Sequence, residues 1–396
     1  MGDYSQVHDV GVANIAQIND VPVANCGQVN DCTKAAAASG ATRWVVGMST
    51  FRVGYAANSD RTSWTFYDMV AGTGHPDAID LGFGKDSSGN GIYVMSRDSS
   101  SKELFVSGTD VTNVADWSTV NLSPNSDITT VRWRAASSGA TAGVWIAVGV
   151  QSNKKIYRST DGASSWTAIN LSGLTGHNTD KIKGIDGDGA GKWMFGQEDR
   201  IYYSTDDGAN WAVSTPFSGD TGENAVHDIT GIKYTNSSWV ITYEVVLSGV
   251  FQAKTYIRSC AETDITDWSD GVDTGAPNHS SGNVASRTSI ASSNGRIAIV
   301  PHKSPTVARA DINGKTISNV AAIPKASDTG TTDRFRDIEC DGSTWMIVTL
   351  NGDVYESTDN AESWSKTLDD MGSTNATGGV TGDDSIAVTC DVFGPL

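Results

Sequence analysis

Basic residues, histidine, cysteine and long apolar runs are all scarce in this sequence of 396 residues. Its 28 Lys and Arg are outnumbered by 46 Asp and Glu, which gives a net charge of −18. We therefore expect neither nucleic acid nor an anionic membrane surface as a partner, because both require a concentrated basic face. The sequence contains no run of about eighteen apolar residues, so we expect no segment to insert into a membrane.

The few cysteines and histidines exclude the usual metal and disulfide frameworks. The five cysteines are odd in number and form no CxxC pair, so we interpret them as small buried residues. The six histidines show no HxH or HxxxH spacing, which argues against a zinc site. Asp186-Gly187-Asp188-Gly189 begins like a calcium loop, but no downstream Glu completes it. We expect no metal, no cofactor and no catalytic residue.

The sequence is instead rich in turn-forming and strand-forming residues. It contains 42 Gly and 12 Trp, and Ser, Thr, Asn and Asp are frequent throughout. This composition favours many short strands that are joined by tight turns, and disfavours helices with an apolar stripe. The sequence therefore predicts an all-β protein.

Three segments of the pattern Ser-Thr-Asp, each ending in Trp, follow short strands that contain an aromatic residue. They resemble the Asp-box, or BNR repeat, which is best known from sialidases. The defining residues are Ser159, Asp161 and Trp166; Ser204, Asp206, Gly208 and Trp211; and Ser357, Asp359 and Trp364. An Asp at a hairpin tip can accept hydrogen bonds from the amides of its own turn, and the Trp can cover the hairpin. The resemblance implies peripheral turns of propeller blades, so we interpret these residues as scaffold.

The spacing of the tryptophans that follow such turns counts the blades. They occur at positions 64, 117, 166, 211, 268 and 364, and one unit near Asn313-Gly314-Lys315 has no Trp. The resulting period of roughly fifty residues is typical of a four-stranded propeller blade. Seven units indicate a single seven-bladed propeller over residues 35–396. Eight apolar strands recur as well, and the last, Ser385 to Cys390, either completes the first blade or begins an eighth.

Residues 1–34 carry a different repeat, with a period of 11 residues. Each unit has an apolar pattern that suits a strand, a polar corner and another strand. Such units resemble N-terminal segments of structural proteins of tailed bacteriophages. They are too small to fold alone, which predicts an assembly segment that binds other virion proteins. The residues that define it are Gln6, Val7, Gln17, Ile18, Asn19, Asp20, Gln28, Val29, Asn30 and Asp31.

Together these features predict a non-enzymatic structural protein of a phage virion, in its tail, fibre or capsid decoration. We expect a homo-oligomer that displays the propeller outward, where it binds a cell-surface glycan or protein. The sequence begins Met1-Gly2-Asp3-Tyr4-Ser5, without a basic and then apolar leader, which fits assembly in the host cytoplasm.

Two alternatives stay open. Phe51-Arg52-Val53-Gly54 resembles the Phe/Tyr-Arg-Ile-Pro motif of sialidases, in which the Arg grips the substrate carboxylate, but it lacks the Pro. A sialidase site also needs three converging guanidinium groups, a Tyr nucleophile assisted by Glu, and a carboxylic acid. The second alternative is an assembly factor built on an Asp-box propeller, which would need a targeting peptide and a basic patch. Other arginines that could contribute to a sialidase site are Arg132, Arg134, Arg258, Arg287, Arg334 and Arg336.

Overall fold

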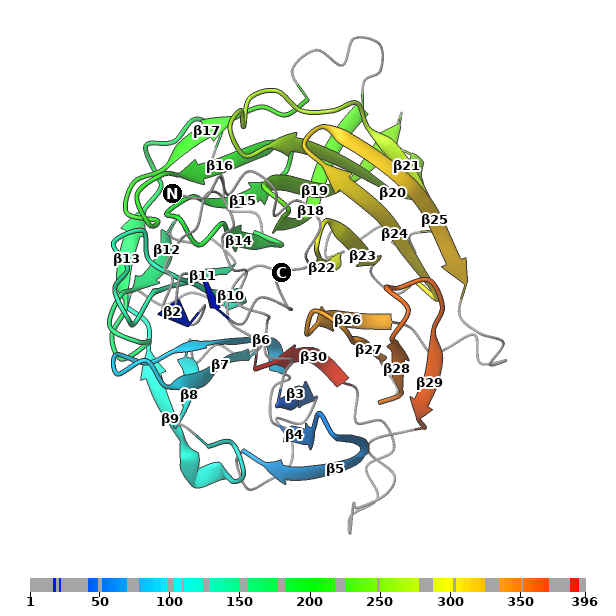
Figure 1. Ribbon diagram of the computed structural model, residues 1–396. Coiled ribbons are helices and arrows are strands. Elements are labelled where there is room, and N and C mark those ends of the chain that lie inside the picture. Colours follow the sequence, from blue (N-terminus) through cyan, green and yellow to red (C-terminus); the bar gives the residue numbers. More distant parts are fainter. Residues whose placement is uncertain are drawn as a thin grey trace. The chain divides into compact units, whose positions relative to one another are not determined.

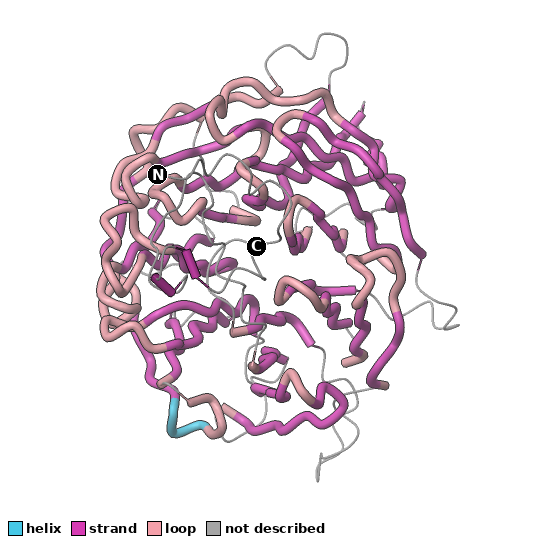
Figure 2. Tube along the Cα trace, in the orientation of Figure 1, coloured by secondary structure: helices cyan, strands magenta, loops and turns pink. Residues whose placement is uncertain are grey.

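Strands make up nearly all of the regular structure, and the residues described contain a single short 3-10 helix, η4 (Val114–Asp116) (Figure 2). No described helix is long and apolar enough to cross a membrane. The computed structural model describes residues 17–18, 21–22, 42–48, 52–69, 78–97, 103–108, 110–123, 128–149, 155–176, 182–217, 225–247, 250–277, 288–301, 304–324, 335–349, 352–369 and 385–391.

The chain divides into two units, residues 1–39 and 40–396. In the first unit, β1 (Gln17–Ile18) and β2 (Val21–Pro22) pair antiparallel. This pair belongs to the second of the 11-residue repeats. The other residues of the predicted assembly segment, and the predicted boundary between residues 34 and 35, lie outside the described residues.

The second unit is a propeller of seven four-stranded antiparallel sheets, or blades, arranged around a common centre (Figure 1). Six blades use four consecutive strands, numbered here from first (innermost) to fourth (outermost). They are blade 2, β6 (Ala78–Lys85), β7 (Gly91–Arg97), β8 (Glu103–Ser107) and β9 (Trp117–Asn121); blade 3, β10 (Ile128–Arg134), β11 (Val144–Gly149), β12 (Lys155–Ser159) and β13 (Thr167–Asn170); blade 4, β14 (Ile185–Gly187), β15 (Trp193–Gln197), β16 (Arg200–Ser204) and β17 (Ala212–Ser214); blade 5, β18 (Ala225–Thr235), β19 (Ser238–Leu247), β20 (Val250–Ala261) and β21 (Val272–Pro277); blade 6, β22 (Ser289–Ser293), β23 (Arg296–Val300), β24 (Thr306–Asn313) and β25 (Thr316–Pro324); and blade 7, β26 (Phe335–Cys340), β27 (Trp345–Thr349), β28 (Val354–Ser357) and β29 (Ser365–Leu368).

Blade 1 joins the two ends of the propeller. Its strands are, in order, β30 (Ser385–Cys390), β3 (Arg43–Met48), β4 (Arg52–Ala57) and β5 (Asp60–Asp68). The last strand in sequence is therefore the first strand of the first blade, which confirms seven blades and resolves the choice left open by the sequence. The Asp391 carboxylate extends this closure, because it accepts the amides of Thr42 at 2.6 Å and Arg43 at 2.9 Å.

The second strands are apolar because both of their faces are buried between blades. Every residue of β11, β15, β23 and β27 is buried. Fourth strands such as β5 and β25 are instead largely exposed. Seven of the eight apolar segments recognised in the sequence are the second strands, and the eighth is the closing strand β30.

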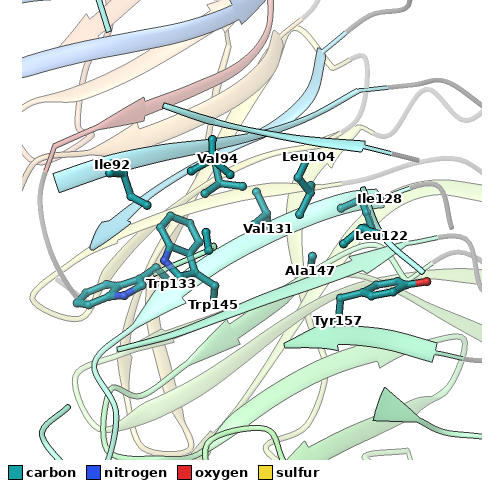
Figure 3. Close-up of a cluster of buried hydrophobic side chains, with 12 residues drawn as sticks. Ile92, Val94, Leu104, Leu122, Ile128, Val131, Trp133, Trp145, Ala147 and Tyr157 are labelled. Atoms are coloured by element: carbon teal, nitrogen blue, oxygen red, sulfur yellow. The ribbon is translucent and has the colours of Figure 1, made fainter. Parts of the chain in front are cut away.

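Seven hydrophobic clusters hold the blades together, one at each interface between neighbouring blades. Figure 3 shows the cluster between blades 2 and 3, in which Ile92, Val94 and Leu104 from blade 2 face Trp145 and Tyr157 from blade 3. The core is therefore a ring of packed interfaces, and each blade is stabilised by the neighbour on either side.

The tryptophans divide into two groups by burial. Those of the second strands are at most 1 % exposed, namely Trp44, Trp145, Trp193, Trp239 and Trp345. Among those that follow the turns, Trp64, Trp268 and Trp364 are 8 % exposed, whereas Trp117, Trp166 and Trp211 are only half-buried. The second-strand tryptophans thus carry more of the packing than the turn tryptophans do.

We expect Trp193→Ala to lower the free energy of unfolding by about 3–5 kcal/mol, since it empties a fully buried site. Trp211→Ala, in the same blade, should cost about 1–3 kcal/mol, because less apolar surface leaves the core. Equilibrium denaturation of both variants measures the difference. Equal losses would show that the turn tryptophan packs as tightly as the strand tryptophan.

Candidate functional site

The three Ser-Thr-Asp turns (residues 159–166, 204–211 and 357–364) connect the third and fourth strands of blades 3, 4 and 7. In the first, the Asp161 carboxylate accepts the amide of Ser165 at 3.0 Å and its hydroxyl at 2.5 Å. The Ser159 hydroxyl donates to Asp161 at 2.8 Å and accepts the amide of Ala163 at 3.0 Å. The polar groups of the motif are therefore used within the turn itself.

The other two turns repeat this arrangement with the same roles. The serine hydroxyls of Ser204 and Ser357 accept the amides of Gly208 at 2.9 Å and Ala361 at 3.0 Å, and the carboxylates of Asp206 and Asp359 accept the amides of Asn210 at 2.8 Å and Ser363 at 3.0 Å. The residue four after the serine has a φ of 64° in Ala163, 78° in Gly208 and 61° in Ala361. This left-handed conformation explains why the motif favours Gly at that position.

Four of the turn tryptophans complete their hairpins with one hydrogen bond to the turn. The indole of Trp211 donates to the Gly208 carbonyl at 2.9 Å, and that of Trp166 donates to the Ala163 carbonyl at 3.2 Å. The related turns after Asp60 and Asp264 do the same through Trp64 and Trp268, whose indoles each donate to the carbonyl three residues earlier. The indole nitrogen of Trp364 is buried without a partner.

Turns between third and fourth strands also contact the preceding blade, and we call these the rim contacts. The Asp207 carboxylate of blade 4 accepts the amide of Ser137 of blade 3 at 3.0 Å and its hydroxyl at 2.6 Å. Further rim contacts are Lys192 to Glu262 at 3.0 Å, Arg296 to Glu362 at 2.9 Å, Arg43 to Asp110 at 3.3 Å, and Asn58 to Asp341 at 3.2 Å. These contacts fix the angle between neighbouring blades at their outer part.

At the centre, three buried aspartates connect the first strands of neighbouring blades. Each carboxylate accepts the backbone amide of the first strand of the next blade, Asp80 from Val131 at 2.8 Å, Asp186 from Tyr234 at 2.9 Å, and Asp337 from Val388 at 2.9 Å. We call these hydrogen bonds the axial latches. The β-ladder slips by one residue just before Asp80 and again just before Asp337. Such bulges re-aim the side chain that follows them, here towards the neighbouring blade.

Five residues at equivalent positions of the first strands form a ring, which we call the axial ring. Each lies opposite the second-strand residue that follows the tryptophan, and they are Arg132, Asp186, Lys233, Glu339 and Thr389. All but Asp186 line a cavity of about 40 Å³, together with Phe83 and Ser292 of the two blades whose second strands lack a tryptophan. Trp133, Arg134 and Cys340 line it as well, so it lies towards the ends of the first strands.

The cations of this cavity differ in how they are paired. Arg132 donates through Nη1 to Asp80 at 2.6 Å, and Arg134 is paired with Asp186 and donates through Nε to the Gly187 carbonyl at 2.8 Å. Burial alone would lower the pKa of Arg132, but the surrounding carboxylates, Asp80 foremost, raise it above its usual range. Lys233 has no carboxylate within ion-pair distance among the described residues.

The described arginines of the sialidase alternative are distributed over blades 1, 3, 5 and 7. Arg52 is on β4, a third strand, where Nε is 3.0 Å from the Asp68 carboxylate and the guanidinium covers the Phe66 ring. Arg258 is on β20, also a third strand, where it stacks on Phe217 and donates to the Pro216 carbonyl. Arg132 and Arg134 on β10 and Arg336 on β26 are on first strands at the centre. Arg287 and Arg334 lie outside the described residues.

The aspartates of the calcium-like loop and the described cysteines have other roles in the fold. Asp186 is an axial latch, and Asp188 accepts the amides of Ala190 and Lys192 in a turn. Within the described part of the chain, no group of three His, Cys, Asp or Glu could hold a metal ion. Cys260 and Cys340 are buried free thiols, and burial raises the pKa of each to about 12. Cys390 is buried and free too.

The sequence reasoning missed the axial latches and the axial ring. The latch partners are 48 to 51 residues apart, which is one blade period. The three aspartates do not share one offset from the second strand that follows them, so no simple spacing rule marks them. In a chain with 46 acidic residues, the latch aspartates cannot be distinguished from the others until the strand register is known.

We expect Asp359→Asn to lower the free energy of unfolding at neutral pH and to weaken its dependence on pH in the acidic range. Burial raises the pKa of Asp359, but hydrogen bonds led by Ser363 outweigh it and lower the pKa from 3.8 to about 2. A carboxyl group whose pKa is lower in the folded protein than in the unfolded protein stabilises the fold at a pH above its unfolded pKa. This contribution to the free energy of unfolding is lost as the pH falls from about 4 to 2. Denaturation at several pH values measures the effect, with the 86 % exposed Asp369→Asn as control. Parallel pH profiles for wild type and Asp359→Asn would contradict this assignment.

We expect Asp337→Ala to lower the free energy of unfolding by about 2–4 kcal/mol, because it orphans buried donors. Asp337 accepts the hydroxyl of Ser289 in blade 6 and the amide of Val388 in blade 1, so it connects three blades. Asp337→Asn keeps one acceptor and should cost less. Asp369→Ala, at an exposed position, should change stability by no more than about 0.5 kcal/mol. A loss at Asp337 as small as that at Asp369 would mean that the latch contributes little.

No protein-family model matches the chain, and no curated protein matches it. The chain is similar to three solved propeller structures. These are "YCF48 bound to D1 peptide" (15 % identity, 75 % of this chain and 82 % of that chain, TM-score 0.45), YCF48 from Cyanidioschyzon merolae (14 %, 75 % and 86 %, TM-score 0.47), and the WD40 β-propeller domain of Doa1 (12 %, 81 % and 87 %, TM-score 0.49). At such identities and scores the likeness says nothing about activity or partners. The assignment as a seven-bladed propeller rests on the seven four-stranded sheets themselves.

Proposed function

We propose that the protein is a non-catalytic structural component of a tailed-phage virion, in which the propeller is a rigid body displayed outward and residues 1–34 anchor it. The observation that carries the proposal is the combination of the 11-residue repeat with a propeller whose blades are joined both at the centre and further out. Axial latches such as Asp337 to Val388 join the blades at the centre, and rim contacts such as Ser137 to Asp207 join them further out.

The charged groups that form the axial latches and the rim contacts support a scaffold role, because they are paired within the propeller. Arg134 and Asp186 are at most 9 % exposed at their side chains and pair with each other. Arg296 contacts both Asp311 and Glu362, and Arg309 contacts Glu362 as well. Groups used in this way hold the shape of the body and are costly to displace. A body of fixed shape suits repeated display on a particle.

The β1–β2 pair supports the proposed mode of anchoring. Gln17 lies opposite Pro22 and Ile18 lies opposite Val21, so at least one repeat unit contains two paired strands. An isolated two-stranded pair is marginally stable in water. Addition to strands of a neighbouring virion protein or subunit would satisfy its remaining backbone groups. Three successive units would let several weak contacts act together.

The proposed location follows from the same features. The protein assembles in the host cytoplasm with other virion proteins and with copies of itself through residues 1–34. On the finished particle the propeller is exposed to the outside, where its surface binds a glycan or protein of the host cell. The strong negative charge of the chain keeps a densely displayed protein soluble.

We expect deletion of residues 2–34 to abolish incorporation into particles while the propeller stays folded, because the ring closes through β30 and β3 without that segment. Virions made with full-length or truncated protein are purified on a density gradient and compared by mass spectrometry. The control is Asp337→Asn, which weakens the ring and leaves the anchor intact. Normal incorporation of the truncated protein, or a truncated protein that does not fold, would overturn the proposed role of the segment.

A further inference from the structure

The axial cavity contains cationic donors that the described residues leave unused. Nη1 of Arg132 donates to Asp80 and to the Val131 carbonyl, and no other hydrogen bond joins Arg132 to the described residues. A guanidinium has five N–H donors, so most of those of Arg132 remain available. Lys233, which also lines the cavity, has neither a hydrogen bond nor an ion pair among the described residues.

The same cavity contains one carboxylate with spare acceptor capacity. Oε1 of Glu339 accepts the amide of Cys340 at 3.0 Å, and no described residue donates to Oε2. An ionised carboxylate can only accept hydrogen bonds, so Oε2 can bind only a donor. An occupant that uses all three groups accepts hydrogen bonds from Arg132 and Lys233 and donates one to Glu339.

The size and charge of the cavity narrow the class of ligand further. A volume of about 40 Å³ is enough for a few water molecules or one small ion. Asp80 and Asp186 pair with the two arginines, so Lys233 and Glu339 are the charged lining residues that have no ion-pair partner among the described residues.

We propose that the axial cavity binds one hydrogen phosphate ion. Its unprotonated oxygens accept hydrogen bonds from Arg132 and Lys233, which are charge-assisted and therefore strong. Its single P–OH group donates to Glu339. Sulfate has the same shape but no proton at neutral pH, so it would place an oxygen lone pair against the Glu339 carboxylate. The cavity therefore selects phosphate over sulfate by means of one carboxylate.

The bound ion would join three blades that are not neighbours in the ring. Arg132 belongs to blade 3, Lys233 to blade 5 and Glu339 to blade 7. Because the cavity exists only in the closed propeller, the ion binds the folded state alone and raises its melting temperature. Phosphate would act here as a central structural ligand of the ring.

The test is thermal unfolding of the full-length protein in phosphate, sulfate or chloride at pH 7 and equal ionic strength, with isothermal titration calorimetry for affinity. We expect a saturable rise in melting temperature with phosphate alone. Lys233→Met should weaken phosphate binding at least tenfold. Lys315→Met is the matched control, since Lys315 forms an exposed ion pair with Asp267 at the rim, and it should bind phosphate as the wild type does.

The Glu339→Gln variant tests the preference for phosphate over sulfate directly. A glutamine can donate where the glutamate could only accept, so this variant should bind sulfate, which the wild type rejects, and lose its preference for phosphate. This readout is a gain of binding and does not depend on the stability of Lys233→Met. Equal responses of the wild type to phosphate and sulfate would overturn the proposal, as would undiminished phosphate binding by a folded Lys233→Met variant.

Discussion

The hydrogen bond that a buried aspartate accepts from a backbone amide of the next blade is the interaction on which the closed ring depends. First strands pair with a second strand on one side only, so their other edge faces the centre with unpaired amides and carbonyls. Asp80, Asp186 and Asp337 each reach across to one such amide. A buried carboxylate is costly unless it is well bonded, and Arg132, Arg134 and Ser289 supply the additional partners. Hydrophobic packing alone would hold the blades side by side without setting their register.

The features that the sequence predicted well are local ones. The Ser-Thr-Asp turns follow from three or four adjacent residues, and their hydrogen bonds are those that an Asp at a hairpin tip is able to make. Second strands such as Trp145 to Gly149 are recognisable because burial on both faces requires a continuous apolar run. The count of seven blades followed from the spacing of these two local signals.

The features that the sequence could not decide are pairings between distant segments. The partner of Ser385–Cys390 is Arg43–Met48, more than 330 residues away, and the apolar pattern of β30 fits either a closing strand or a new blade. The axial ring takes one residue from each of five first strands, and Arg132, Lys233 and Glu339 have nothing in common except register. The burial of Trp211 was likewise beyond a sequence pattern, because the same motif leaves Trp364 buried and Trp211 half-exposed.

The closing strand has a consequence for how the protein is made on the ribosome. β3 to β5 leave the exit tunnel first, but their blade lacks its first strand until β30 has been synthesised, after all other strands of the ring. Until then, blades 2 to 7 form an open arc with unpaired apolar faces at both ends. Such an intermediate is prone to aggregate or to exchange blades with another nascent chain. Emergence of β30, and not the folding of any single blade, is thus the step at which the ring can close and bury its two end faces.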